Sequence, residues 1–589
     1  MILQALTSLY EALAQKGEIS KEGWSREKIS FALGIDENGD LLRITPLFET
    51  VDGPKGKTRE VPQKMTVPAA VKRTSGAAAN FLWDNSSYIL GVSLKKGEND
   101  AEREKRRNKD IKCFEACREL HHSMLDGMEY PAAKAVLNFL DKWEPQKAEE
   151  NNLVAQYAKE ILSGANMVFR FNGGYVHDDP QLASVWQKAN AKQKDNIGQC
   201  LITGELDAIP NTHPTIKGVQ GAQSSGAALV SFNASAFCSY NKEQNQNAPV
   251  GKYAAFAYTT ALNHLLADRK NVHRIGDAAV VCWAENADKQ YEDFAADLFF
   301  GDGDGDQSDE QRLSALQASV ELLAKGLPCR ELDLDPERKF YILGISPNAA
   351  RLAVRFFYCD SFGNIVKNIK AHYDRLEIVR PSYDKYPMLP LWKLLSATVN
   401  PSAKDKTPNS AMAGAVARAV FSGGRYPASL LECTFLRIRA EREITRERAA
   451  IIKAYYLRNP NEKCPKEVLT VSLNKDSKNV PYTLGRLFSV YEEIQQAANP
   501  GINTTIKDKY FGSAATMPAT VFPILSSLAQ KHLRKLSDAQ RIYLDKKVMT
   551  LKDILGEQYP AHMSLPEQGS FDLGYYHQTQ DRYTKKEDK

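Results

Sequence analysis

The stretch Lys217–Gly251 reads KGVQGAQSSGAALVSFNASAFCSYNKEQNQNAPVG and is the least ordinary passage of the chain. It opens with a loop rich in glycine, glutamine and serine, and an apolar segment at 227–232 with the composition of a strand follows. Neutral amides then gather at Asn233, Asn241, Gln244, Asn245, Gln246 and Asn247. Because acids are few and hydrogen-bonding groups are many, the stretch predicts a surface that contacts polar edges or a polymer backbone. A glycine-rich turn before a strand is the structural alternative.

Two familiar motifs are excluded in this stretch. Gly221 and Gly226 have the spacing of a phosphate-binding P-loop, but Ala227 and Ala228 occupy the positions where Lys and Ser or Thr hold phosphate and Mg²⁺. The serines also miss the G-x-S-x-G spacing of a hydrolase nucleophile by one residue. The loop therefore offers hydrogen-bonding groups without a nucleotide-binding or hydrolase motif.

The composition is that of an ordinary globular protein, with 589 residues, 43% of them hydrophobic and 25% charged. This length predicts roughly two to four domains. The net charge of +5 permits nucleic-acid binding without requiring it, since clustering of basic residues matters more. Nine cysteines without framework spacing predict reduced thiols and a cytoplasmic location. Because no apolar run reaches about 18 residues, we expect no membrane-spanning helix and no membrane partner.

The order of the apolar patterns predicts an α+β fold. A mixed α/β N-terminal region with antiparallel sheet elements is expected at 1–385, and a C-terminal helical bundle at 386–589. Alternating residues at 27–48, with Asn38-Gly39 between them, predict a hairpin. Further strands are expected at 85–92, 278–284 and within 339–380, and a strand followed by a turn at 167–176.

A second polar loop, at 72–80, ends in RTSGAAAN. Basic, hydroxyl and amide side chains occur together there, which is the mixture used to contact a phosphate backbone and base edges. The candidates are Lys72, Arg73, Thr74, Ser75 and Asn80. The alternative is a solvated loop pinned by Phe81 and Trp83.

Arginines recur at two later places. Arg351 and Arg355 share one face of an expected strand and form a candidate pair for backbone contacts. The helical segment Leu430–Arg458 carries more basic than acidic residues, and its candidates are Arg437, Arg439 and Arg442. By contrast, acids interleave with the basic residues of 95–112, which predicts the exposed, charge-balanced start of a helix.

No metal or catalytic site emerges from the spacing of reactive residues. Cys200 and His213 are two isolated candidates, fewer than the three or four ligands of a zinc site. The acidic loop at 301–310 resembles the start of a calcium loop but lacks the required Gly and the final Glu. We therefore expect no metal, no cofactor and no enzymatic activity.

Five separated passages, in order, resemble one family across essentially the whole chain. They are MILQALTSLYE (1–11), RTSGAAANFLWDNSSYILG (73–91), GAQSSGAALVSFNASAFCSY (221–240), FYILGISPNAARLAVRF (340–356) and VPYTLGRLFSVYEEIQQAA (480–498). The family is the large subunit of the type I-C CRISPR interference complex, the compact Cascade. The resemblance implies a subunit without catalytic activity that recognises the flanking motif (PAM) in double-stranded DNA. It also implies roles in opening the duplex into an R-loop and in recruiting the helicase–nuclease.

The resemblance implies several partners as well. These are the guide RNA (crRNA), the backbone and 5′-end subunits of the complex, a small subunit, target double-stranded DNA and the helicase–nuclease. In this subtype the C-terminal helical part is also made separately as the small subunit by internal translation. The segment from about Val471 to 589 has the content for such a product.

The resemblance and the two polar loops together assign residue roles. Neutral amides suit the acceptor-rich A·T edges of a minor groove, and glycines allow close approach. The leading contacts to the flanking motif are Asn80 and Gln223. The other candidates are Thr74, Ser75, Gln220, Ser224 and Ser225 for the motif, and Lys72, Arg73 and Lys217 for phosphates.

Two other classes of protein stay open. A metal-dependent nucleic-acid enzyme would draw on the acidic loop, and its cleavage activity would be lost on the substitution Asp302→Ala. A purely structural scaffold would join other subunits and would bind DNA without regard to the flanking bases.

Overall fold

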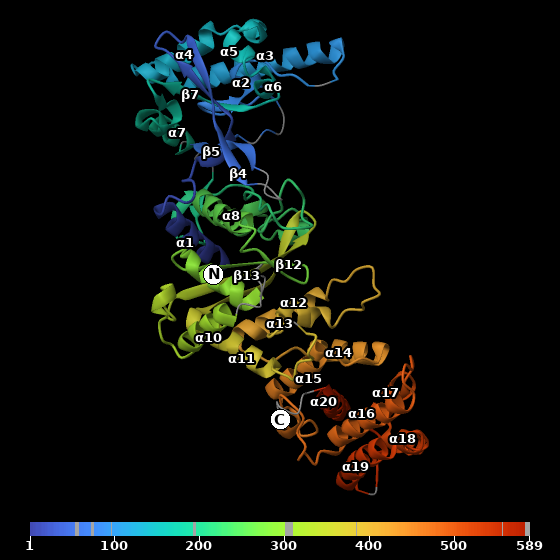
Figure 1. Ribbon diagram of the computed structural model, residues 1–589. Helices are drawn as coiled ribbons and strands as arrows, with labels where there is room; N and C mark the ends of the chain where they lie inside the picture. Colours follow the sequence, from blue (N-terminus) through green and yellow to red (C-terminus); the bar gives the residue numbers. More distant parts are fainter. Residues whose placement is uncertain are drawn as a thin grey trace. The chain divides into compact units, whose positions relative to one another are not determined.

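The computed structural model describes residues 1–52, 58–71, 73, 76–95, 97–191, 196–300, 310–384, 386–556 and 558–583 (Figure 1). The chain divides into two compact units. The N-terminal unit contains residues 6–214 and 231–261, and the C-terminal unit contains residues 1–5, 215–230 and 262–589. The stretch 217–251 is therefore shared: its glycine-rich loop belongs to the C-terminal unit and its amide cluster to the N-terminal unit.

The N-terminal unit is built on a sheet with the strand order β3-β2-β7-β6, and the short strand β8 pairs with β7. The strands are β2 (Phe31–Ile35), β3 (Leu41–Pro46), β6 (Trp83–Asn85), β7 (Asn166–Phe171) and β8 (Gly174–Tyr175). β2 and β7 run parallel, whereas the other pairs are antiparallel. β2 and β3 form the predicted hairpin over 31–46, whereas Ile29, expected in the same hairpin, belongs to the separate strand Trp24–Ile29. Its turn includes Gly39, whose φ of +82° and close approach to Asn138 leave no room for a side chain.

Helices pack on one face of this sheet, and a second sheet packs on the other face. Because successive strand residues point to opposite faces, Leu33 packs in a core with Phe139 of helix α4 (Pro131–Lys142), whereas Ala32 packs with Val67 of a second sheet. The second sheet, in the order β1-β5-β4, comprises β1 (Trp24–Ile29), β4 (Phe48–Asp52) and β5 (Thr58–Pro68). The helices are α2 (Ser86–Ile89), α3 (Asp100–Leu125), α4 (Pro131–Lys142), α5 (Asn152–Ala155), α6 (Ala158–Ile161) and α7 (Pro180–Ala191).

A second part of the N-terminal unit surrounds α1 (Ile2–Gln15) and α8 (Lys252–Ala267), both of which continue into the C-terminal unit. The ring of Tyr10 meets that of Phe256 edge-on, with 5.6 Å between the centroids. A small hairpin of β9 (Ile197–Gln199) and β10 (Leu206–Ala208) precedes the amide cluster.

The C-terminal unit contains an antiparallel sheet in the order β11-β12-β13-β14. Its strands are β11 (His273–Ile275), β12 (Ala278–Ala284), β13 (Lys339–Asn348) and β14 (Arg351–Ser361), which confirms the strands expected at 278–284 and within 339–380. Phe340, Ile342 and Phe356 face a core shared with nearby helices. The helices are α9 (Lys289–Ala295), a π-helical turn (Ala296–Phe300), α10 (Glu310–Ala324), α11 (Phe362–Leu376) and α13 (Ser410–Ser422).

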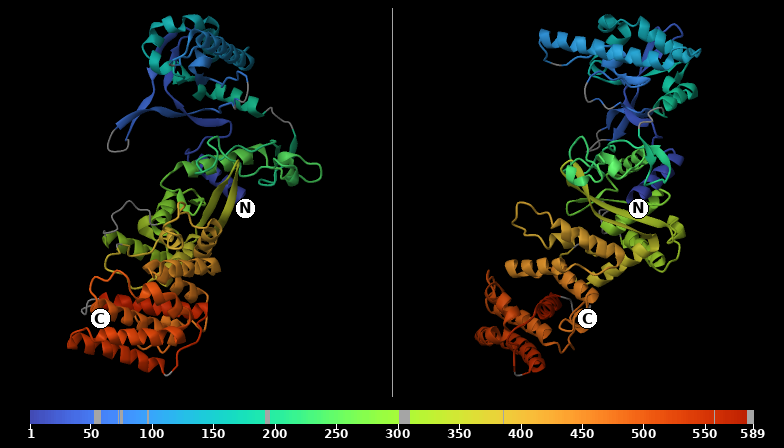
Figure 2. Two further views of the ribbon diagram at one scale, coloured as in Figure 1. Left: turned by 90° about the vertical axis from the view of Figure 1, so that its right-hand side faces the viewer. Right: turned by 180° about the vertical axis from the view of Figure 1, so that it is seen from behind.

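The remaining helices form the bundle seen at the end of the chain (Figure 2). They are α12 (Leu391–Ser396), α14 (Ala428–Glu441), α15 (Arg446–Arg458), α16 (Val480–Ala498), α17 (Ile506–Thr516), α18 (Pro518–Leu533), α19 (Asp538–Leu555) and α20 (Leu565–Tyr583). Gly485 and Gly574 let α16 and α20 approach closely. A Cβ at Gly485 would lie 1.9 Å from the carbonyl oxygen of Phe571, and a Cβ at Gly574 would lie 2.0 Å from that of Tyr482. The buried residues of the bundle and of the sheet form one continuous core, and a domain boundary near 385 stays a prediction.

The α+β class is confirmed, but two expected strands are wrong. Asn85 ends β6, and its Oδ1 accepts a hydrogen bond from the backbone N–H of Ser87 at 3.0 Å, which caps α2 where a strand was expected. At 227–232 the structure has two isolated bridges, from Ala227 and from Ala228, in place of a strand. No helix in the described part of the chain is long and apolar enough to span a membrane.

Candidate nucleic-acid interface

The amide loop, defined as residues 217–226, is closed at its base by a bridge. Ile216 and Ala227 exchange two backbone hydrogen bonds, at 2.8 and 2.9 Å. Val219 is buried and anchors the loop. The side chains predicted to bind are all exposed: Lys217, Gln220, Gln223, Ser224 and Ser225. The structure therefore presents these candidates together on one loop.

Side chains also fix the two ends of the amide loop. The Oδ1 of Asn263, on α8, accepts from the backbone N–H of Lys217 at 2.8 Å, and its Nδ2 donates to the carbonyl of Thr215 at 3.1 Å. The hydroxyl of Thr215 donates to the carbonyl of Ser225 at 3.2 Å. Because these bonds satisfy the backbone at both ends, the loop is organised before any ligand arrives.

Glycine is required at the exit of the loop. Gly226 has φ of +100°, and a Cβ there would lie 2.7 Å from Thr215. A side chain at this position would therefore be strained and would also push Thr215 away from Ser225.

Two arginines, on the two edge strands of the sheet β11-β12-β13-β14, adjoin the amide loop. Arg274 of β11 donates from Nη1 to Oε1 of Gln220 at 3.0 Å. Ala228, just after the loop, forms a parallel bridge with Arg351 at the start of β14. The predicted backbone contact Arg351 is thus brought beside the loop. Arg274 was not predicted, because the β11 segment has no distinctive sequence pattern.

Arg355, the other arginine predicted on this strand, is in a different situation. Its Nη2 lies 2.6 Å from Oδ2 of Asp277. Burial raises the pKa of Asp277, but the hydrogen bond and charge of Arg355 outweigh this and the net pKa is below the usual value. The pairing of β13 and β14 shifts and passes over Arg355, so the strict alternation assumed for Arg351 and Arg355 is interrupted.

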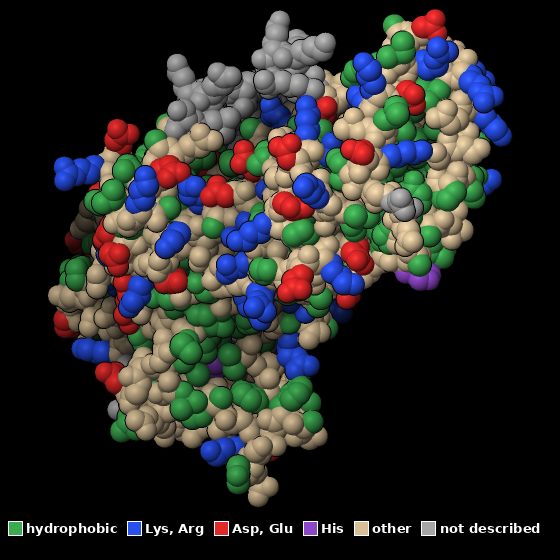
Figure 3. Space-filling view, turned by 90° about the horizontal axis from the view of Figure 1, so that it is seen from below, with side chains coloured by type: hydrophobic (Ala, Val, Ile, Leu, Met, Phe, Trp, Pro, Cys, Tyr) green, Lys and Arg blue, Asp and Glu red, His purple; other side chains and the backbone are tan. Residues whose placement is uncertain are grey.

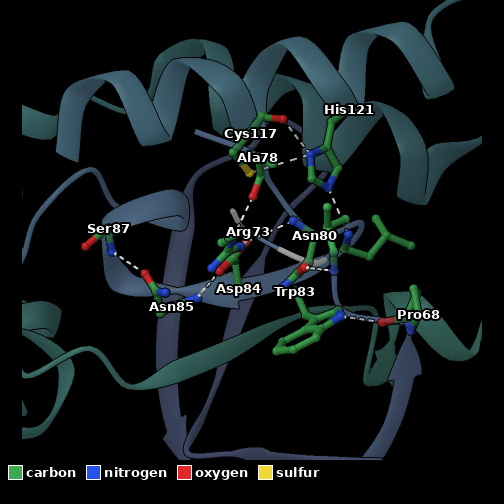
Figure 4. Close-up of polar contacts among 12 residues, drawn as sticks. Pro68, Arg73, Ala78, Asn80, Trp83, Asp84, Asn85, Ser87, Cys117 and His121 are labelled. Carbon is green, nitrogen blue, oxygen red and sulfur yellow. Dashed lines mark hydrogen bonds and ion pairs between the residues drawn. The ribbon is translucent and has the colours of Figure 1, made fainter. Parts of the chain in front are cut away.

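The second predicted loop is held from within by Asp84 (Figure 4). The carboxylate is 1% exposed, accepts from the backbone N–H groups of Asn80 and Asn85 at 2.9 and 2.8 Å, and forms an ion pair with Arg73. Arg73 also donates to the carbonyl of Ala78 at 2.7 Å and lies over the ring of Tyr88. Arg73 therefore serves the loop itself, and about a third of its side chain remains exposed.

Asn80, a leading candidate for base contact, is buried at 3% exposure. Its Oδ1 accepts from the backbone N–H of Val71 at 2.9 Å, which joins the two ends of the loop. This side chain supports the loop in the structure, so a direct base contact would require the loop to open. Lys72, Thr74 and Ser75 lie outside the described residues.

His121 on α3 completes this support. Its Nε2 accepts from the backbone N–H of Leu82 at 2.9 Å and its Nδ1 donates to the carbonyl of Cys117 at 2.7 Å. Burial lowers the pKa of His121 to about 4, so the imidazole is neutral. Burial likewise raises the pKa of Asp84, opposed by the Asn80 N–H and by Arg73. No sequence pattern marks these two residues, since their partners are contributed by the fold.

The amide cluster is partly an internal framework. Asn245 is buried, accepts from Nε2 of His213 at 2.8 Å, and donates to the carbonyls of Pro210 and Val250. The amide of Asn247 bonds the backbone of residues 239, 242 and 244. These two amides are thus used inside the protein, whereas the other four amides of the cluster, Asn233, Asn241, Gln244 and Gln246, are exposed.

The basic helices α14 and α15 expose fewer charges than their sequence suggests. Arg446, Arg448 and Lys453 are buried, and Lys453 donates to the carbonyls of Arg375 and Glu377. Of the three candidates on these helices, Arg437 pairs with Glu441 at 3.5 Å, Arg439 donates to Gln568 at 2.8 Å, and Arg442 is exposed at the end of α14. On the face in Figure 3, Lys and Arg are interspersed with Asp and Glu.

Reactive residues do not gather in the described part of the chain. No group of three or more His, Cys, Asp or Glu residues there could hold a metal ion. His213 bonds the hydroxyl of Tyr258 and the amide of Asn245, which accounts for both ring nitrogens. The acidic loop with Asp302, Asp304 and Asp306 lies outside the described residues.

The fold and the amide loop define a large α+β protein with a preformed hydrogen-bonding surface and adjoining arginines. The chain belongs to the Csd1 family of CRISPR-associated proteins, because the family model Cas_Csd1 matches residues 6–583. The match includes nearly all of both units. No curated protein matches the chain.

Proposed function

We propose that this CRISPR-associated protein is the non-catalytic large subunit of an RNA-guided surveillance complex of type I-C. In this role the amide loop reads the flanking motif in double-stranded DNA, which promotes duplex opening and R-loop formation. Guide pairing then reads the target itself, as is general for such complexes. The subunit also helps to recruit the helicase–nuclease.

The observation that carries the proposal is the built geometry of the amide loop. Gln223, Ser224 and Ser225 are exposed, while the backbone beneath them is fixed by Asn263 and Thr215. A rigid loop of amides and hydroxyls can place hydrogen-bonding groups against base edges at little entropic cost. Arg274 and Arg351 supply positive charge next to it, which suits phosphates.

The family membership supports the choice of partners. A CRISPR-associated protein works with a guide RNA and other proteins of its complex, and we assign the backbone, 5′-end and small subunits as neighbours. The small subunit would be the separately made segment from about Val471. Dependence of this product on a start codon near 471 is tested by silent recoding of that codon in the gene.

The direct test compares two glutamine substitutions in the guide-loaded complex. Gln223→Ala removes an exposed amide of the loop, and Gln530→Ala removes an exposed amide on α18 as the matched control. Dissociation constants are measured on duplexes that differ only in the flanking bases. We expect Gln223→Ala to reduce discrimination between flanks by about 5- to 150-fold, the effect of about 1–3 kcal/mol for one base contact. Equal discrimination in the two variants would contradict the assignment.

The same complexes and duplexes also test whether the chain is instead a scaffold or an enzyme. A scaffold would raise affinity equally for every flank. An enzyme would cleave the DNA in a metal-dependent way, and Asp302→Ala would abolish the cleavage. Either result would replace the proposed function.

A further inference from the structure

We propose that a lysine-lined groove along the first half of α3 binds the phosphate backbone of duplex DNA. The groove has a volume of about 960 Å³ and lies between α3 and the segment before it. Its four lysines are Lys95, Lys105, Lys109 and Lys112, all exposed. Figures 1 and 2 show the N-terminal half of α3 extending beyond the rest of its unit.

The acids around the groove are largely committed to other contacts. Glu98 binds Nε of Arg106 at 2.7 Å, and Asp110 accepts from the hydroxyl of Ser93 at 2.6 Å and lies 3.6 Å from Arg106. Glu102 accepts from the backbone N–H of Asn99 at 3.1 Å in a capping box. The exposed helix start with interleaved charges that was predicted at 95–112 is confirmed, and these carboxylates are held by an arginine and by the helix start.

The lysines, by contrast, form no ion pair with any residue that the structure describes. Lys105, Lys109 and Lys112 follow at spacings of four and three residues, which places them on one face of the helix. They span about 10 Å along the axis. The lining holds four lysines and Arg106 against three carboxylates, Glu98, Glu102 and Glu104, so the groove is positively charged overall.

The residues that line the groove favour the phosphate backbone of a duplex over a single strand. Proteins that hold single strands stack bases on aromatic side chains, and no aromatic residue lines this groove. Flexible ammonium groups in a row suit a chain of phosphates whose bases face away, as in a duplex. The choice of DNA rests on the proposed function, whereas the attraction for phosphates follows from the charge alone.

The test uses two triple variants of the full chain in the guide-loaded complex. Lys105→Gln, Lys109→Gln and Lys112→Gln together remove the free lysines. The matched control combines Lys134→Gln, Lys142→Gln and Lys147→Gln, which remove three exposed lysines of the same unit that are already paired with acids. Affinity for one target duplex is measured across a series of salt concentrations.

We expect the groove variant to weaken binding about equally for every flank and to flatten the slope of log affinity against log salt by about 2–3. The control should leave the slope unchanged. Identical slopes in the two variants would overturn the proposal. Loss of complex assembly, with normal DNA binding by the complexes that form, would identify a protein-binding surface and would also overturn it. Discrimination between flanking bases is measured separately from the salt slope. Failure of the groove proposal can therefore be distinguished from failure of the proposed function.

Discussion

The side-chain amide of Asn263 binds the backbone N–H of Lys217 at 2.8 Å and so joins α8 to the first residue of the amide loop. The Nδ2 of the same side chain donates to the carbonyl of Thr215, the residue before the bridge residue Ile216. Together with the Ile216–Ala227 bridge, this side chain fixes the start of the loop. Asn263 is a positioning residue, and its effect on binding must pass through the loop.

Replacing Asn263 with Ala is expected to reduce flank discrimination while it leaves every exposed amide in place. The lost hydrogen bonds should also lower the free energy of unfolding by about 1–3 kcal/mol. Discrimination and thermal unfolding are measured together. Gln530→Ala again serves as the control, since this exposed side chain on α18 lies outside the amide loop. Unchanged discrimination despite lower stability would show that loop orientation does not matter.

Replacing Asn80 with Ala is expected to loosen the loop before β6. The backbone N–H of Val71 would lose its acceptor, at a cost of about 1–3 kcal/mol. Limited proteolysis of the 69–80 segment should therefore be faster, and flank discrimination should fall only as far as the loop is disordered. A complete loss of discrimination with unchanged proteolysis would instead indicate that Asn80 contacts a base directly.

Acid is expected to destabilise the protein partly through His121. Its pKa in the folded state is about 4 because it is buried, whereas an unfolded histidine has about 6.5. As the pH falls below 6.5 the unfolded chain gains a proton that the folded chain does not, so stability is lost until the pH reaches about 4. The slope for this one group is about 1.4 kcal/mol per pH unit.

The check is the pH dependence of thermal unfolding in His121→Gln, whose amide can still donate and accept. The fall in melting temperature between neutral pH and pH about 4.5 should be smaller than in the unmodified protein. Part of the fall should remain, because burial also lowers the pKa values of His372 and His577 to about 3. An identical fall would contradict the role of His121.

Gly485→Ala is expected to destabilise the bundle by more than about 2 kcal/mol, since its Cβ would overlap the carbonyl of Phe571. The matched control is Gly512→Ala on α17, where nothing lies within 4 Å of the new Cβ. That change should be neutral or stabilising by up to about 1 kcal/mol, the difference in helix propensity. Similar melting temperatures for the two variants would disprove the close crossing of α16 and α20.

Substitutions in the basic helices α14 and α15 test which arginines bind DNA and which support the fold. Arg439→Gln with Arg442→Gln should lower the salt slope of DNA binding by about 2 if these residues contact phosphates. Arg446→Gln should instead unfold the region, because Arg446 is buried, pairs with Asp384 at 2.9 Å and donates to Pro387. An unchanged slope in the double variant would remove α14 from the interface.

Local patterns in the sequence predict much of the fold. The hairpin of β2 and β3 and the strands β12, β13 and β14 follow from alternation and turn residues, and the structure confirms them. The short helix α2 could not be predicted, because a capping bond from Asn85 overrides the apolar pattern of 85–92. Single bridges at Ala227 and Ala228 likewise depend on partners distant in the chain.

The candidate site shows the same division. The exposed amides of 217–226 are visible in the sequence as a run of Gly, Gln and Ser. The burial of Asn80 and Asn245 could not be predicted from the sequence. An asparagine that bonds the protein's own backbone cannot be distinguished by sequence from one that faces a ligand. For α3 the sequence misleads in the other direction. Its lysines look paired with nearby carboxylates, but in the described part of the fold those carboxylates bond other groups and the lysines stay free.

The most direct test of the proposed function measures duplex binding by the guide-loaded complex, with and without this chain, on targets that differ only in the flanking bases. We predict that discrimination between flanks appears only when the chain is present, and that Gln223→Ala reduces it. Equal gains in affinity for every flank would contradict this role and would make the chain a scaffold or a general binder of the DNA backbone.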